Sequence, residues 1–363
     1  MTSRDAQMRR QSFEFLRALM NAPTPSSFET AGQRVWCDYV RCFADRVTTD
    51  SYGNVAAVLN PSGRPVVLLD GHIDEIGLMV KYINDKGFIY FQAIGLVSPK
   101  ILPAQRVQIH TAKGPILGVI GAIPPHQTMD DEKKDLALHD LAIDIGAADG
   151  KAAARRVSVG DPITLISQFA MLSEDVAVAR AFDDRAGAWA AAEALRLVAA
   201  RRRELHCCVV ACSTVQEEYG IRGAMMNVFN IRPDAAVVIE TGIATDSPGL
   251  DQSRWGRMAV GDGPVIMIGR ENHPALVRRL RKVAKGRKIK LQENAFFFQQ
   301  DGTNASAIYP AVGGVPTALV SVCTRYIHSP VEVLSIKDLR QTAELIAAVC
   351  LDIKKDEAFR VEV

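Results

Sequence analysis

The segment VVLLDGHIDE, residues 66–75, joins an apolar run to a cluster of polar side chains. The run Val66 to Leu69 contains only valine and leucine, which is typical of a strand buried on both faces of a sheet. It ends at Asp70–Gly71–His72. In an open α/β sheet, ligands bind beyond the carboxyl ends of such strands. The segment therefore predicts an α/β fold with a functional site at the end of this strand.

Helices and strands are predicted on both sides of this segment. Apolar residues at helical spacing predict a helix over residues 9–21, and Ser26–Ser27–Phe28–Glu29 has the spacing of a capping box that begins a second helix ending near Val40. The last helix has Ser335 as its expected cap, with Asp338 three residues on. We also expect a hairpin over residues 47–59, strands at 207–213 and 235–239, and helices at 186–203, 274–285 and 336–354. Together these elements predict a doubly covered sheet.

Residues 77–169 differ from the rest of the chain. They contain short alternating runs punctuated by glycine, and they show little helical periodicity. We therefore expect a small β-rich domain over residues 77–169, inserted into an α/β domain formed by residues 1–76 and 170–363.

Composition limits the class of protein. The chain is 48% hydrophobic and 23% charged, so it can bury a large core, and its net charge of +2 with interspersed signs does not indicate a nucleic-acid partner. We interpret the basic run at 278–290 as a solvated helix face. No stretch approaches the length of a membrane span, and residues 1–20 lack the uninterrupted apolar core of a secretory signal. We expect a soluble, cytoplasmic protein.

The cysteines agree with a reducing compartment. Their number is odd and no two have the CxxC spacing of a metal or redox site. We expect them to be buried thiols. They are Cys37, Cys42, Cys207, Cys208, Cys212, Cys323 and Cys350.

Five separate segments place an acid or a histidine where a hydrophobic strand is expected to end. They are His72–Ile73–Asp74–Glu75, Asp183–Asp184, Glu217–Glu218, Glu240 and His328. Two imidazoles and several carboxylates, without a cysteine, suit zinc, cobalt or manganese better than a thiolate-bound structural site. The joint pattern predicts a dinuclear metal site and hydrolytic chemistry.

Each segment taken alone also has a simpler interpretation. His72 can be a structural histidine, although a carboxylate two residues on can hold its imidazole tautomer. Asp183–Asp184 can be a helix cap, which is compatible with ligation. The adjacent acids Glu217 and Glu218 would repel one another, whereas a cation would let one of them ligate and leave the other as a general base.

Longer strings resemble a known family. LLDGHIDEIGLMV (68–80), AFDDRAG (181–187), TVQEEYGIRGA (214–224) and TRYIHSPVEV (324–333) resemble the tetrahedral and glutamyl aminopeptidases, which are dinuclear metallopeptidases. GAIPPH (121–126) and LAIDIGA (141–147) resemble parts of that family's dimerisation domain. The resemblance implies a zinc-exopeptidase-like sheet with an inserted β-rich dimerisation domain.

Carried over to this chain, the resemblance implies a role for each site residue. Asp183 would bridge two metal ions, with His72 and Glu240 completing one site and Glu218 and His328 the other. Asp74 would orient His72, and Glu217 would be the general base for a metal-activated water. Each subunit would bind two divalent ions, zinc first, with cobalt or manganese as alternatives. The resemblance also implies a cis peptide bond between Asp183 and Asp184.

Two positions depart from the family's pattern. Glu240 stands where the family usually has aspartate, so its carboxylate must reach one methylene further. Asn304, in QQDGTNASAI (299–308), stands where an acid is expected. The preferred substrate side chain stays open, with Arg222, Arg254 and Asn304 as candidate contacts; Arg222 can equally pair with a surface carboxylate.

The function expected from the residues and the resemblance is a metal-dependent aminopeptidase that removes N-terminal residues from short peptides. Family members assemble through the insert into dimers and then into hollow tetrahedral dodecamers, so we expect a homo-oligomer. One alternative is a deacylase or other amidase that uses the same two-metal chemistry on a non-peptide amide. The other is a non-catalytic scaffold that retains the fold.

Overall fold

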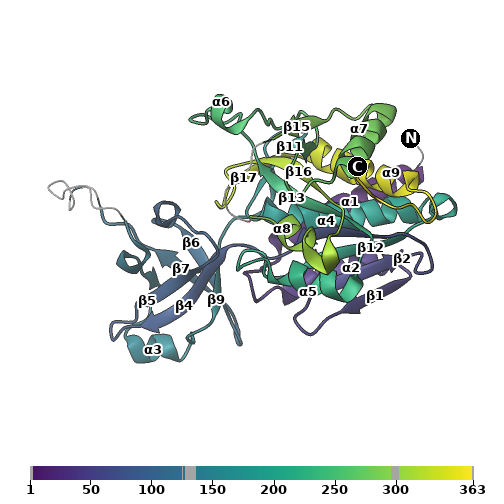
Figure 1. The fold of residues 1–363 in the computed structure, drawn as a ribbon. Helices are drawn as coiled ribbons and strands as arrows, with labels where there is room; N and C mark the ends of the chain where they lie inside the picture. Colours follow the sequence, from purple (N-terminus) through teal and green to yellow (C-terminus); the bar gives the residue numbers. More distant parts are fainter. Residues whose placement is uncertain (1–2, 125, 127–135, 296–301, 362–363) are drawn as a thin grey trace.

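The computed structural model describes residues 3–124, 126, 136–295 and 302–361. Pro125 of the GAIPPH string and Gln299, Gln300 and Asp301 of QQDGTNASAI lie outside the described residues. Figure 1 shows an α/β part with helices packed around a sheet, and a β barrel that projects beside it. The barrel interrupts the α/β part between β3 and β10 in the chain.

The large sheet has eleven strands, nine of them in the order β1-β2-β12-β3-β13-β16-β17-β11-β10, with β14 pairing to β16 and β15 pairing to β14. Their bounds are β1 Arg46–Thr49, β2 Val55–Leu59, β3 Val66–His72, β10 Ala170–Met171, β11 Val176–Ala179, β12 Cys208–Thr214, β13 Ala235–Ile243, β14 Val265–Met267, β15 Gln292–Asn294, β16 Thr317–Arg325 and β17 Glu332–Ser335.

Four strands at the centre of the sheet run parallel. β12 pairs with β3, β3 with β13, and β13 with β16, and Thr214 of β12 lies opposite His72 of β3. Because parallel strands end on the same side, their carboxyl ends gather at one edge. That edge is where the polar segments of the sequence follow their strands.

Helices cover both faces of the sheet, as predicted. α1, α2, α4, α7 and α9 share one buried apolar cluster with the sheet, while α5 and α8 pack on the other face. α4 approaches β3 closely because two glycines face each other: a Cβ on Gly71 would lie 2.4 Å from the carbonyl carbon of Gly187. The helices are α1 Ser3–Asn21, α2 Thr30–Val40, α3 Gly150–Ala154, α4 Phe182–Ala199, α5 Arg222–Ile231, α6 Gln252–Trp255, α7 Pro274–Arg287, α8 Asn304–Ile308 and α9 Ile336–Asp352.

Several helix boundaries differ from prediction. The second helix begins at Thr30 rather than after Ser26, because the Glu29 carboxylate accepts the backbone N–H of Ser27 at 2.6 Å and the predicted box does not form. The fourth helix begins at Phe182, not near residue 186, and its first turn is irregular. The cap of α9 is confirmed, since the Asp338 N–H donates to the Ser335 hydroxyl at 3.1 Å.

The inserted domain is a closed six-stranded barrel in the order β4-β5-β8-β7-β6-β9, with β9 closing on β4. Its strands run from Gly77 to Leu165, inside the range expected for the insert. Alternate side chains such as Val107, Ile109 and Ile163 fill its core. The strand bounds are β4 Gly77–Ile83, β5 Ile89–Ile94, β6 Arg106–Thr111, β7 Gly114–Ile120, β8 Ile143–Asp144 and β9 Pro162–Leu165.

The predictions for the basic run and for the cysteines are confirmed in part. The basic run lies mostly on α7, where Arg281 pairs with Glu293 and Lys282 with Asp352, as expected of a solvated face. All seven cysteines are free, and six are buried. Cys42 is exposed, so the prediction of a buried thiol is wrong there; it follows the end of α2, beyond the helix's buried face. Among the described residues, no helix is long and apolar enough to cross a membrane.

Candidate metal centre

The predicted site residues converge at the carboxyl edge of the parallel strands. His72 is the last residue of β3, and Glu217 and Glu218 follow β12. His328 follows β16, and Asp183 lies in the irregular first turn of α4. Strands that are distant in the chain thus deliver their polar ends to one place.

Glu240 is delivered differently from the prediction. It lies inside β13, which continues to Ile243, rather than beyond the end of a strand at Ile239. Parallel pairing with β16 continues past it, with Glu240 opposite Ser321 and Thr241 opposite Val322. The sheet ladder therefore holds the backbone of Glu240 directly.

His72, Glu217 and Glu240 form the first ligand group, in which donor atoms of all three residues lie within 4.8 Å of one another. His72 Nε2 lies 3.6 Å from Glu240 Oε1 and 3.7 Å from Glu217 Oε2. Glu217, expected as a general base, is thus as close to the imidazole as the expected ligand Glu240.

Asp183, Glu218 and His328 form the second ligand group. His328 Nε2 lies 3.3 Å from both Asp183 Oδ2 and Glu218 Oε1. The other oxygen of Asp183, Oδ1, lies 3.4 Å from His72 Nε2 of the first group. One carboxylate therefore faces both histidines, which is the geometry of a bridging ligand.

The spacing of these atoms fits divalent cations. Atoms bound at about 2.0–2.1 Å to one tetrahedral zinc ion lie about 3.3–3.4 Å apart. Both separations from His328 in the second group, 3.3 Å each, equal that spacing, as does the 3.4 Å from Asp183 to His72, which joins the groups. The separations from His72 in the first group, 3.6 and 3.7 Å, are slightly longer. Glu218 Oε1 is buried, accepts no hydrogen bond and lies 3.3 Å from His328 Nε2, so it is available as a ligand atom. Imidazole and carboxylate donors of this kind suit zinc, cobalt or manganese.

The electrostatics also require positive charge. Burial raises the pKa of Glu217 to about 8, against the opposing effect of His72. Burial, reinforced by Asp184, raises the pKa of Glu240 well above its usual value. Burial alone would lower the pKa of His328, but Asp183 and Glu218 outweigh it and raise the pKa to about 11. In the absence of a cation, this group of side chains favours bound protons, whereas a bound cation would neutralise the carboxylates.

Asp74 supports both ligand groups from behind. His72 Nδ1 lies 3.2 Å from the backbone carbonyl oxygen of Asp74 and 3.4 Å from Asp74 Oδ1, contacts that can hold the imidazole in one orientation. The two carboxylate oxygens of Asp74 also accept the backbone N–H groups of Glu217 and Glu218, at 3.0 and 3.1 Å. A single buried carboxylate therefore ties the end of β3 to the loop after β12.

Asp183 and Asp184 have separate roles, one as a candidate ligand and the other as a helix cap. The peptide bond that joins them is cis, as the resemblance implied. Asp183 faces the histidines, whereas Asp184 Oδ1 accepts the N–H of Gly187 at 2.9 Å, in the manner of a helix cap. Asp184 Oδ2 also accepts the backbone N–H of His72 at 3.2 Å. The pair thus supplies both a candidate ligand and a cap.

Two supporting contacts were not anticipated from the sequence. Glu332 accepts backbone N–H groups from Asp183 and His328, and the only signal for it was an acid four residues after His328. The ring of His328 lies with Nδ1 3.0 Å from the carbonyl oxygen of Leu96, in the barrel domain. The inserted domain therefore helps to orient a candidate ligand.

The three candidate substrate contacts lie outside both groups. Asn304 is buried, and its amide donates to Asp70 Oδ2 at 2.7 Å and to Thr214 Oγ1 at 2.9 Å, so it supports the ends of β3 and β12. Its role as a candidate substrate contact stays a hypothesis. Arg222 is exposed at the start of α5, and the exposed Arg254 stacks on Trp255.

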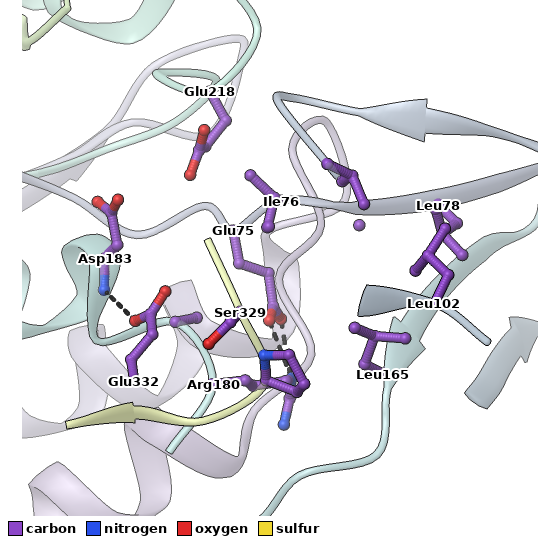
Figure 2. Close-up of a pocket in the computed structure, with 14 residues that line it drawn as sticks. Glu75, Ile76, Leu78, Leu102, Leu165, Arg180, Asp183, Glu218, Ser329 and Glu332 are labelled. Atoms are coloured by element: carbon purple, nitrogen blue, oxygen red, sulfur yellow. Dashed lines mark hydrogen bonds and ion pairs between the residues drawn. The ribbon is translucent and has the colours of Figure 1, made fainter. Parts of the chain in front are cut away.

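A pocket opens beside the second ligand group (Figure 2). The space between its lining residues, open solvent included, is about 430 Å³. Asp183 and Glu218 line one side, and the side chains opposite are apolar and come largely from the barrel domain. Arg180 and Glu75 also line it, but they neutralise each other in an ion pair of 2.9 Å. The apolar lining residues are Ile76, Leu78, Val97, Leu102 and Leu165.

A mixed sheet with an inserted barrel, and two histidine–carboxylate groups where parallel strands end, define a metal-dependent hydrolase. The family model of the M42 glutamyl aminopeptidases matches residues 53–345. The chain therefore belongs to the M42 glutamyl aminopeptidase family, and it is a metallo-aminopeptidase that hydrolyses peptide bonds.

Individual relatives are similar over nearly the whole chain. The lysyl aminopeptidase of Pyrococcus furiosus is 33% identical over 352 residues, which cover 94% of this chain and 97% of the relative. The TET aminopeptidase of Thaumarchaeota archaeon SCGC AB-539-E09 is 34% identical with a TM-score of 0.90, covering 95% of this chain and 97% of that structure. PhTET1, whose structure is a dodecamer, is 31% identical with a TM-score of 0.83, covering 94% and 99%.

Proposed function

We propose that this protein is a two-metal aminopeptidase that removes N-terminal residues from short peptides. The observation that carries the proposal is the position of Asp183, whose two carboxylate oxygens face His72 at 3.4 Å and His328 at 3.3 Å. A carboxylate shared in this way brings two cations close enough to act on one peptide bond.

In this proposal Asp183 bridges the two ions. His72 and Glu240 complete the first site, and Glu218 and His328 complete the second. Each subunit binds two divalent ions, zinc first, with cobalt or manganese as alternatives. When bound, the ions supply Lewis acidity that lowers the pKa of a water molecule, polarises the scissile carbonyl and neutralises the developing oxyanion.

Glu217 is the proposed general base. Its carboxylate takes a proton from the attacking water, whose oxygen bonds to the carbonyl carbon, and returns the proton to the nitrogen of the leaving amine. Asp74 positions this base, since it accepts the backbone N–H of Glu217 at 3.0 Å. The proposed second role of Asp74 is to hold the His72 imidazole, 3.4 Å away, in one orientation.

The proposed substrate carries an apolar side chain next to the scissile bond. The pocket beside Asp183 and Glu218 presents Leu78, Leu102 and Leu165 to whatever enters it. Glu75 and Arg180 neutralise each other in their ion pair. Glu332 also lines the pocket, but both of its oxygens accept backbone N–H groups. The wall opposite Asp183 and Glu218 is therefore mainly apolar. Apolar side chains gain most from such a lining.

The proposed working form is a homo-oligomer built from dimers through the barrel domain, up to a dodecamer. Exposed apolar side chains on the barrel support this, since Leu117 and Ile123 are 60% and 71% exposed. The dodecameric structure of the similar PhTET1 supports it as well.

The experiment is release of amino acids from free and N-acetylated dipeptides and tripeptides. Chelator-stripped protein is assayed alone and after zinc, cobalt or manganese is restored. We expect metal-dependent release only from peptides with a free α-amine, fastest when the first residues are apolar. Cleavage of the acetylated peptides would favour the amidase alternative, and inactivity with all three metals would contradict the proposal.

A further inference from the structure

Glu332 joins two candidate ligands through their backbones. It is the first residue of β17 and is 1% exposed. Its Oε2 accepts the N–H of Asp183 at 2.9 Å, and its Oε1 accepts the N–H of His328 at 2.9 Å. Figure 2 shows the first of these bonds, with the Asp183 carboxylate turned away from Glu332. One side chain thus connects segments that are 145 positions apart in the chain.

The two backbones that Glu332 holds are not in regular structure. Asp183 has a non-helical ψ of 109° in the first turn of α4. His328 lies in the loop between β16 and β17 and has a positive φ of 62°, as has Tyr326 two residues before it. No hydrogen bond of a sheet ladder fixes these two N–H groups. The carboxylate of Glu332 therefore sets the positions of both backbones, from which the side chains of Asp183 and His328 extend into the site.

Glu332 itself stays outside the ligand groups. Both of its oxygens are used by backbone N–H groups, and neither group of candidate ligands includes it. Its buried negative charge lies beside that of Asp183, an arrangement that a nearby cation stabilises. Glu332 would therefore affect the binding of an ion only by positioning Asp183 and His328.

Two other carboxylates in the site also accept two backbone N–H groups each. Asp74 accepts the N–H groups of Glu217 and Glu218, and Asp184 accepts those of His72 and Gly187. Each of these carboxylates holds a segment that carries a candidate ligand. Glu240 is the exception among the candidates, because the sheet ladder already holds its backbone.

We infer that Glu332 is a positioning residue that sets the separation of Asp183 and His328 and thereby the affinity of the second metal site. This inference rests on the ligand roles proposed above. Partners of this kind behind metal ligands typically change metal affinity about 10- to 100-fold when they are removed.

The test is a zinc titration of chelator-stripped Glu332→Gln by calorimetry, beside wild type. The amide can accept one N–H through its oxygen, but its NH₂ group faces the other N–H and cannot accept it. We expect zinc to bind about 10- to 100-fold more weakly at the second site, with a smaller loss at the first site, which shares only Asp183 with it. The visible absorption of cobalt bound at the second site should change as well.

Glu193→Gln is the matched control. Glu193 is equally buried, at 3% exposed, but it bonds to Arg196 and Tyr39 on α4 and α2, away from the ligand groups. We expect this variant to lose thermal stability without losing zinc affinity. Equal loss of zinc affinity in both variants would overturn the inference, as would wild-type affinity in a folded Glu332→Gln.

Two further variants keep the test decisive. Glu332→Asp retains the charge but not the reach, and we expect intermediate affinity for the second ion; if Glu332→Gln does not fold, wild-type affinity in Glu332→Asp overturns the inference. His328→Ala should abolish the second site altogether. If His328→Ala still binds two ions, the ligand assignment fails rather than the role of Glu332.

Discussion

Glu217 and Glu218 are neighbours in the chain but enter different ligand groups. Glu217 lies with His72 and Glu240, and Glu218 with Asp183 and His328. Both backbones are held by Asp74, so the turn between them directs one carboxylate to each group. Glu217 Oε2 lies 3.7 Å from His72 Nε2, against 3.6 Å for Glu240 Oε1, so distance alone does not separate a base from a ligand.

Glu217→Gln separates the roles of base and ligand. As a general base, Glu217 contributes proton transfer, so we expect kcat to fall about 10²- to 10⁴-fold while zinc affinity and stoichiometry stay at wild-type values. Steady-state kinetics and a zinc titration measure both. A parallel loss of zinc affinity would identify Glu217 as a ligand instead.

Glu29 carries a pH dependence although it belongs to neither ligand group. It is 5% exposed, and burial, reinforced by Asp74, raises its pKa from 4.5 to about 7. Between these values the folded protein holds more protons than the unfolded chain, so this residue makes stability fall as pH rises from about 5 to 8. Its carboxylate oxygen Oε1 accepts the N–H groups of Ser27 and Gln216.

Glu29→Gln removes the titration and keeps an oxygen for the same N–H groups. We expect the variant to match wild type near pH 5 and to be more stable near pH 8, by up to about 3 kcal/mol, because a buried charge is lost. Urea denaturation at the two pH values measures the difference. A constant difference between variant and wild type would contradict the assignment.

The contact between β3 and α4 links fold stability to the site. A Cβ on Gly71 would lie 2.4 Å from the carbonyl carbon of Gly187 and 2.5 Å from the nitrogen of Ala188, both in the backbone of α4. A backbone cannot move aside as a side chain can, so α4 would shift as a whole. Because Asp183 and Asp184 lie in its first turn, the shift would reach the ligand groups.

Gly71→Ala should therefore lower both stability and metal affinity. Overpacking of this kind typically costs about 1–3 kcal/mol. Gly286→Ala is the matched control, because a Cβ on Gly286 in α7 would meet nothing within 4 Å. Thermal denaturation and zinc titration of both variants measure the effects. Gly71→Ala with wild-type zinc affinity would show that α4 does not transmit the shift.

The strand β3 was predicted more accurately than the start of α2, for a physical reason. The run Val66 to Leu69 is apolar because both faces of β3 are covered, so the strand can be recognised from its apolar sequence alone. The start of α2 depends instead on which backbone N–H the Glu29 carboxylate meets, and Gln216 competes for it from 187 positions away. Local spacing alone does not contain that contact.

The barrel gives the molecule its candidate assembly surface. It projects from the α/β part in Figure 1, and β7 exposes Leu117 and Val119 on alternate positions, at 60% and 42%. With the self-association proposed above, these side chains would become buried between copies. An oligomer that depends on these side chains should therefore dissociate into species of smaller mass when charged residues replace them.

Leu117→Lys combined with Val119→Lys should reduce the oligomer to smaller species. Light scattering after size-exclusion chromatography measures the mass, and circular dichroism checks that the fold is retained. Tyr52→Ser is the matched control, since Tyr52 is 65% exposed at the β1–β2 hairpin of the α/β part. A double variant that keeps the wild-type mass would place the contact elsewhere.

The approximate positions of the central strands and the chemical type of the candidate ligands can be read from the chain, because each is encoded locally. A buried strand needs an apolar run, and a ligand needs an imidazole or a carboxylate at its end, as at His72 and Glu218. Which atoms meet is not local. Glu332 reaches Asp183 and His328, and the Leu96 carbonyl reaches His328, only because the folded backbone brings these segments together. Two of these contacts, Glu332 with Asp183 and Leu96 with His328, join segments more than a hundred positions apart, so no spacing in the sequence records them.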